Sequence, residues 1–99
     1  MASIELYNER YEVLINNRYK HNNQPVIEIA DKLGMPSGVI SVCIPNHNFE
    51  ENETAISSDV DQEEVAKQLS DQGVIKITGK TARSGYGQYP VVEVLGEIG

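Results

Sequence analysis

The sequence has no tryptophan, a single cysteine at Cys43, and no apolar run approaching the about 20 residues that a membrane-spanning helix requires. A lone cysteine excludes a disulfide within the chain, and we therefore expect a reducing compartment such as the cytoplasm. The first residues also lack the basic region and apolar stretch of a secretory signal. We expect no membrane association.

Cations are scarce as well. The chain has 8 Lys and Arg against 15 Asp and Glu, which gives a formal net charge of −7. Binding to a phosphate backbone needs cations that displace counterions, so this balance argues against direct nucleic-acid binding and allows a basic partner. A length of 99 residues is enough for one domain, residues 1–99, with one core.

One short stretch supplies the net charge. Residues 50–64 carry seven acidic side chains and no Lys or Arg, whereas residues 1–49 carry a net −1 and residues 65–99 a net +1. A segregated negative face can steer and dock a basic partner, although helix N-terminal charge and solubility also explain it. The candidate partner-binding residues here are Glu50, Glu51, Glu53, Asp59, Asp61, Glu63 and Glu64.

Short alternating or β-branched runs predict that most of the chain is strand. A helix over residues 10–19 is an alternative for the second strand, and the β-branched run at 39–44 is expected to be a central strand that ends at Pro45. We expect an antiparallel sheet of about five or six strands with one helix packed on a face, an α+β fold. The predicted strands are residues 3–7, 10–15, 26–30, 39–44, 54–57, 74–77 and 89–95.

The predicted helix covers residues 60–72. Asp59 is expected to cap it, with Gln62 three residues later, and Gly73 to end it in the left-handed conformation. Apolar residues on one face of this segment predict that it packs on the sheet.

Two weaker motifs concern ligands. The triplet Gly79-Lys80-Thr81 resembles the end of a phosphate-binding loop, but position 74 is Val where that loop needs Gly, so a structured turn explains it better. Cys43 and His47 are four residues apart, which leaves a small metal-binding protein as an alternative although a closed zinc site needs four ligands. We expect no cofactor, no bound metal and no catalytic group.

Residues 78–88 are predicted to be a glycine-rich loop. The stretch 80–89 contributes Lys80, Arg83 and Tyr86 as a second candidate contact surface, because basic and aromatic side chains on loops are common at interfaces. A protein-binding adaptor that uses this loop is therefore an alternative function.

The segment TGKTARSGYGQYP, followed by an apolar strand, resembles the C-terminal signature of an uncharacterised small-domain family. That family occurs on conjugative elements, phages and chromosomes of Firmicutes and Bacteroidetes. The resemblance extends to VISVCIP, ENETAIS, SDQGVI and the opening IELYNERYEV, and so covers most of the chain. Family members often have an aspartate-asparagine turn at positions 57–59 and a cysteine where this chain has Gly87.

The resemblance implies mobile DNA in a bacterial host, where small acidic proteins often disarm defence systems. Combined with the segregated charge, it predicts a non-enzymatic inhibitor of the anti-CRISPR or anti-restriction kind. Such a protein would occlude the basic nucleic-acid groove of a partner, for example a CRISPR effector nuclease. It would act in the cytoplasm of the host cell.

Overall fold

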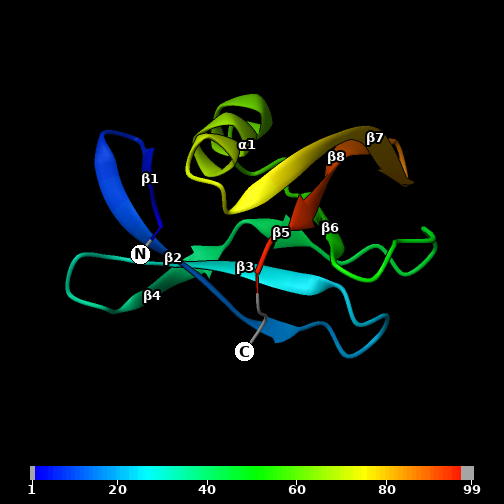
Figure 1. Cartoon of the computed structure of the whole chain (residues 1–99), viewed down its shortest axis with the longest axis horizontal. Coiled ribbons are helices and arrows are strands. Elements are labelled where there is room, and N and C mark those ends of the chain that lie inside the picture. The colour runs from blue at the N-terminus through cyan, green and yellow to red at the C-terminus, as the bar shows by residue number, and fades with distance from the viewer. Residues whose placement is uncertain (1, 97–99) are drawn as a thin grey trace.

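The computed structural model describes residues 2–96 and divides eight strands between two antiparallel four-stranded sheets (Figure 1). The strand order is β1-β2-β3-β4 in the first sheet and β5-β6-β8-β7 in the second. The α+β class is confirmed, although the strands form two sheets where a single sheet of five or six strands was expected. The elements are β1 Ser3–Leu6, β2 Glu9–Arg18, β3 Pro25–Ala30, β4 Pro36–Val39, β5 Ser41–Val42, β6 Glu53–Ile56, α1 Gln62–Asp71, β7 Ile75–Ser84 and β8 Gly87–Val94.

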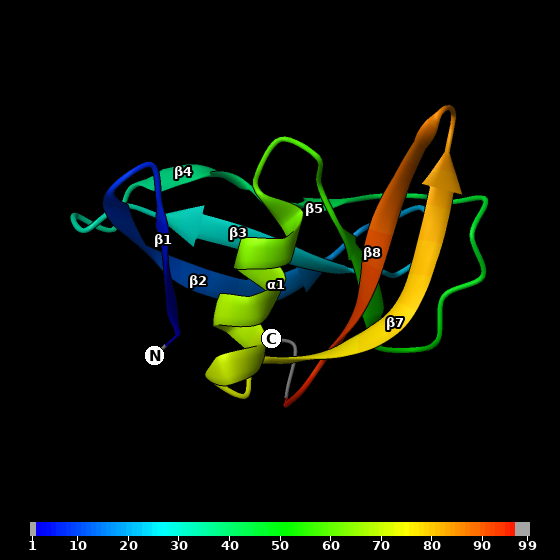
Figure 2. The same cartoon turned by 90° about the horizontal axis from the view of Figure 1, so that it is seen from above.

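The helix packs over both sheets, against β1 of the first and against β7 and β8 of the second (Figure 2). Its buried face is Val65, Ala66 and Leu69, which confirms that the helix packs through one apolar face. These residues join a main core that also contains aliphatic side chains from both sheets. No helix among residues 2–96 is long and apolar enough to cross a membrane.

A second, smaller core contains Ile44, Ala55, Ala82 and Val91. Successive residues of a strand point to opposite faces of the sheet, so β6 contributes Ala55 to this core and its neighbour Ile56 to the main core. The second sheet therefore has apolar contacts on both faces.

The second strand is confirmed as a strand, and the alternative helix over residues 10–19 is wrong. The turn before it lies at Tyr7 and Asn8, one residue earlier than residues 8–9, which separate the two predicted strands, with φ values of 53° and 65°. Two consecutive positive φ values match the twist of a two-residue hairpin. Asn tolerates this region, whereas a Tyr there is unusual, so residue preferences alone do not predict this position for the turn.

The prediction of one central strand at residues 39–44 is wrong. The chain passes from one sheet to the other at the buried Ile40, with β4 as an edge strand before it and β5 as an edge strand after it. The Ile40 N–H donates to the Ile27 carbonyl at 2.9 Å, and its carbonyl accepts from the Ser57 N–H at 2.8 Å. The apolar character of this run therefore reflects a crossing between sheets.

The helix begins at Gln62, and its N-cap is Asp61, so the predicted Asp59 cap is wrong. The Asp61 carboxylate accepts from the Glu64 N–H at 3.2 Å, while Gln62 reaches back to the Ile56 carbonyl at 3.0 Å. Gly73 has φ 73° just beyond the helix, as predicted.

The predicted glycine-rich loop at residues 78–88 is wrong, because these residues form most of the β7–β8 hairpin. The pairing places Ile77 opposite Val92 and Thr81 opposite Pro90, which is four steps along β7 but two along β8. The extra residues form a bulge at Gly79, where φ is +80°. This bulge interrupts the alternation that would otherwise predict a long strand.

Candidate binding surfaces

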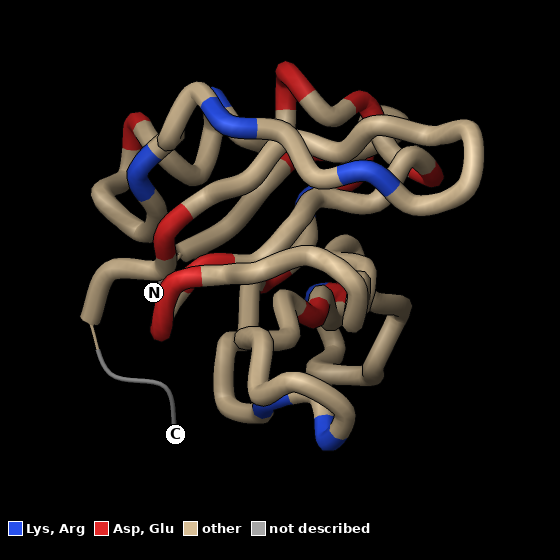
Figure 3. Tube along the Cα trace, turned by 90° about the vertical axis from the view of Figure 1, so that its right-hand side faces the viewer, with Lys and Arg blue, Asp and Glu red and all other residues tan. Residues whose placement is uncertain are grey.

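The structure separates the acidic segment into two groups at opposite ends of β6. Glu50 and Glu51 precede the strand, and Glu53 is its first residue. The residues that follow it are Asp59, Asp61, Glu63 and Glu64. At about 3.3 Å per residue, β6 places about 10 Å between its first and last residues. Figure 3 shows acidic positions at several separate places along the trace. The structure therefore brings the predicted residues together as two surfaces, the acidic loop (residues 50–52) and the helix-start group (Asp59, Asp61, Glu63 and Glu64).

Six of the seven predicted acidic side chains are exposed, and Glu53 is the exception at 5% exposure. Within residues 2–96, none of these six carboxylates lies within 4.0 Å of a Lys or Arg nitrogen, since the one ion pair in this range joins Lys80 to Glu53. Their charge is left uncompensated by neighbouring side chains, which is the arrangement that a surface for a basic partner needs.

The helix-start group also stabilises the helix. Asp61 is the N-cap, and Glu63 and Glu64 lie in the first turn, where the positive end of the helix dipole favours negative charge. Stabilisation of the helix is therefore enough to explain three of the four carboxylates in this group, and no binding partner is needed to account for them.

A single cation anchors the acidic loop through backbone and amide oxygens. The Arg18 guanidinium donates to the Glu51 carbonyl at 3.1 Å, to Asn52 Oδ1 at 2.8 Å and to the Asn23 carbonyl at 2.9 Å. Because these acceptors are not carboxylates, Arg18 fixes the loop and leaves the Glu50 and Glu51 side chains in solvent.

The acidic loop borders a hollow of about 350 Å³ that is lined by Glu50, Glu51, Asn52, Glu53 and Glu93. Glu93 was not among the predicted residues. It lies opposite Glu53 in the β6–β8 pairing, which no local sequence pattern reveals. The pairing thus adds a carboxylate from a distant part of the chain to this surface.

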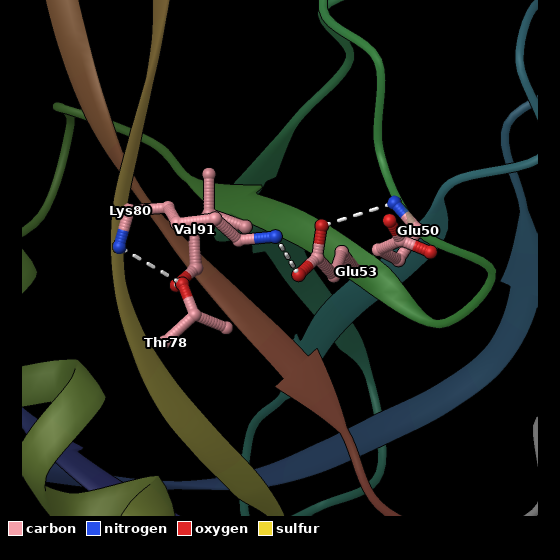
Figure 4. A network of polar contacts seen from close by, with 5 residues as sticks. All are labelled: Glu50, Glu53, Thr78, Lys80 and Val91. Carbon is pink, nitrogen blue, oxygen red and sulfur yellow. Dashed lines mark hydrogen bonds and ion pairs between the residues drawn. The ribbon is translucent and has the colours of Figure 1, made fainter.

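Glu53 binds two partners, one through each carboxylate oxygen (Figure 4). Its Oε1 accepts from the Glu50 N–H at 3.0 Å, and its Oε2 pairs with Lys80 Nζ at 2.5 Å. Burial alone raises the pKa of Glu53, but the hydrogen bonds from Lys80 and Glu50 and the charges of Lys80 and His47 together lower that pKa. Glu53 is therefore a structural carboxylate, and it is not available to a partner.

The second predicted surface is also divided. Lys80 is committed to Glu53, whereas Arg83 lies exposed on β7 and Tyr86 is fully exposed in the turn between β7 and β8. The end of this hairpin thus presents Arg83 and Tyr86 to solvent, and Lys80 contributes to its structure.

The two residues considered for metal binding, Cys43 and His47, each contact another side chain. The Cys43 thiol is 3.7 Å from Asn22 Oδ1, and its pKa is raised by burial. The His47 ring packs edge-on against Phe49, with ring centroids 4.5 Å apart, and His21 lies exposed in the loop before β3. Residues 2–96 contain no group of three or more His, Cys, Asp or Glu side chains placed to hold a metal ion.

Comparisons with protein-family models, with curated proteins and with solved structures find no match to this chain. The resemblance to the mobile-element family therefore stays a prediction.

Proposed function

We propose that this protein is a non-enzymatic inhibitor from a phage or mobile element, which binds a host defence nuclease of the CRISPR or restriction kind. It acts in the bacterial cytoplasm by occupying the Lys- and Arg-lined groove through which the nuclease binds nucleic acid. The observation that carries the proposal is the set of six exposed carboxylates in residues 50–64, none of which pairs with a Lys or Arg among residues 2–96.

The electrostatics of the exposed carboxylates support the proposed binding to a basic groove. Exposed carboxylates steer association with a basic groove, and their effect weakens as salt screens them over about 8 Å at physiological ionic strength. The helix-start group is the better candidate for the groove, because it gathers four carboxylates on adjoining residues of one helix end and the loop before it. A net charge of −7 adds long-range attraction to the same partner.

Charge reversal tests the proposal. Glu63→Lys with Glu64→Lys should weaken binding to a guide-loaded CRISPR effector by about tenfold and reduce the salt dependence of the affinity. The matched control is Glu5→Lys with Asp71→Lys, which changes the net charge by the same amount at exposed positions outside residues 50–64. An equal loss of affinity in both pairs would show that net charge alone matters and would contradict a specific acidic face.

The exposed end of the β7–β8 hairpin favours a second candidate, an adaptor that contacts a protein through Arg83 and Tyr86. Arginine and tyrosine are enriched among residues that dominate protein interfaces. If Arg83→Ala with Tyr86→Ala abolishes capture of a partner while the reversed Glu63 and Glu64 pair retains it, the adaptor replaces the inhibitor.

A further inference from the structure

A single buried carboxylate connects the acidic loop with the β7–β8 hairpin. Glu53 lies on β6, and its Oε1 accepts from the backbone N–H of Glu50 at the start of the acidic loop. Its Oε2 pairs with Lys80 on β7, an edge strand of the second sheet. Since β8 lies between β6 and β7, the Lys80 side chain reaches across a whole strand to make this contact (Figure 4).

Lys80 is held in place by the bulge in β7. The Thr78 hydroxyl donates to the Val91 carbonyl at 2.7 Å and accepts from the Lys80 N–H at 3.1 Å. Gly79 between them has φ +80°, a conformation that a residue with a Cβ rarely adopts. The bulge separates the hairpin into an inner part beside the helix and an outer part that carries Arg83 and Tyr86.

The outer part of the hairpin and the acidic loop also touch the same small core. Ala82 of β7 is buried in that core, and Phe49, which immediately precedes the acidic loop, packs against it. The acidic loop and the outer hairpin are thus connected through this core, by way of Phe49 and Ala82, and through the Glu53–Lys80 ion pair.

We propose that Glu53 is a positioning residue that fixes the acidic loop and the outer β7–β8 hairpin relative to each other, so that they form one binding face. This inference rests on the proposed protein-binding function and specifies the chemistry that a partner must present. A partner that fits such a face presents a basic patch to Glu50 and Glu51 and, at the end of the hairpin, a contact for the exposed Tyr86 ring.

Amide hydrogen exchange tests this coupling on the protein alone. In Lys80→Met, the hydrogen-bonded amides of Glu50 and Glu53 and the amides of residues 81–88 should exchange about fivefold faster relative to the amides of β3, because the buried carboxylate loses its charged partner. Lys80→Arg keeps a positive charge at this position, so exchange in both segments should stay as slow as in the unmodified protein. Lys76→Met is the matched control, since Lys76 is an exposed lysine of the same strand and makes no ion pair within residues 2–96. Faster exchange confined to residues 81–88, or an equal effect of Lys76→Met, would overturn the proposal.

A titration of the unmodified protein gives an independent test that does not depend on a variant folding. The charged groups around Glu53 are Lys80 from β7, Glu93 from β8, and Glu50 and His47 from the preceding loop. Protonation of Glu53 should shift the amide resonances of Glu50 and of residues 80–83 with the midpoint of the Glu53 carboxyl carbon. If Glu53 titrates and either segment fails to follow it, the coupling is absent. Neither test includes a partner, so this result is separate from success or failure of the inhibitor proposal.

Discussion

At the scale of single residues, the buried carboxamide of Gln24 links the two sheets through hydrogen bonds. It lies just before β3, yet its Nε2 donates to the Val42 carbonyl of β5 at 2.8 Å and to Thr54 Oγ1 of β6 at 2.9 Å. Its Oε1 accepts from the Ile44 N–H at 2.8 Å and from Asn22 Nδ2 at 2.6 Å. All of its hydrogen-bonding capacity is used inside the protein, which is the condition for burying a polar group at low cost.

Replacing this side chain with an apolar one of similar size should be strongly destabilising. Gln24→Leu leaves the half-buried Val42 carbonyl and the buried Ile44 N–H without this partner, and we expect a loss of about 2–4 kcal/mol in the free energy of unfolding. Urea denaturation measures it. Gln88→Leu, at an exposed position, serves as the control and should stay within about 0.5 kcal/mol. Equal midpoints for the two variants would show that Gln24 does not hold the sheets together.

The Glu53 carboxylate should make stability depend on acidity. Its pKa is lower in the folded protein than its ordinary value of 4.5, because the hydrogen bonds from Lys80 and Glu50 outweigh the effect of burial. A lowered pKa means that this stabilisation is present above about pH 4.5 and is lost as the pH falls through the folded-state pKa. The free energy of unfolding of Glu53→Gln should therefore fall less steeply below pH 4.5 than that of the unmodified protein.

Glu51→Gln is the control for this acid effect, because Glu51 is an exposed neighbour in the same loop. The two variants differ in burial and in the Lys80 contact. If both variants show the same pH dependence as the unmodified protein, Glu53 contributes nothing to acid sensitivity.

At the scale of elements, the helix protects an edge of the first sheet. Gln68 Oε1 accepts from the Glu5 N–H at 2.7 Å, and its Nε2 donates to the Glu5 carbonyl at 3.1 Å. Gln72, one turn later, makes the same pair of bonds with Ser3, at 3.0 and 2.6 Å. The two amides occupy the backbone groups of β1 that a neighbouring strand would otherwise bond.

Removing both amides should expose this edge. Gln68→Ala with Gln72→Ala should accelerate amide exchange at Ser3 and Glu5 and lower the free energy of unfolding by about 1–2 kcal/mol, the net value of a few solvent-accessible hydrogen bonds. Lys67→Ala, on an exposed position of the same helix, controls for the change in helix propensity. Unchanged protection of Ser3 and Glu5 would show that water replaces the amides without cost.

The sequence predicts elements well where the signal is local. The helix follows from its apolar face and from Gly73, and the first three strands follow from alternation. The predictions fail where pairing between distant segments decides, as at Ile40, which links two sheets, and at Gly79, whose bulge interrupts a long strand. The sequence likewise does not reveal that Glu53 has a structural role unlike the other predicted site residues, because only the folded chain brings Lys80 to it.

At the scale of the whole molecule, charge is distributed unevenly. Six of the exposed acidic residues gather at the two ends of β6, whereas β7 carries Lys76, Lys80 and Arg83 and no acidic residue. The acidic loop and the outer hairpin adjoin the same small core, and Arg83, which follows the buried Ala82, points to the other face of the sheet. This uneven distribution of charge gives a partner a defined orientation as well as attraction.

We propose that the exposed carboxylates bind a basic groove of a defence nuclease. The most direct measurement is capture of a purified, guide-loaded CRISPR effector by the tagged protein at low and at high salt. We expect capture at low salt that declines steeply as salt rises, and loss of capture when Glu63 and Glu64 are changed to Lys. Capture that is insensitive to both salt and these substitutions would contradict it, as would failure of the unmodified protein to compete with nucleic acid for the effector.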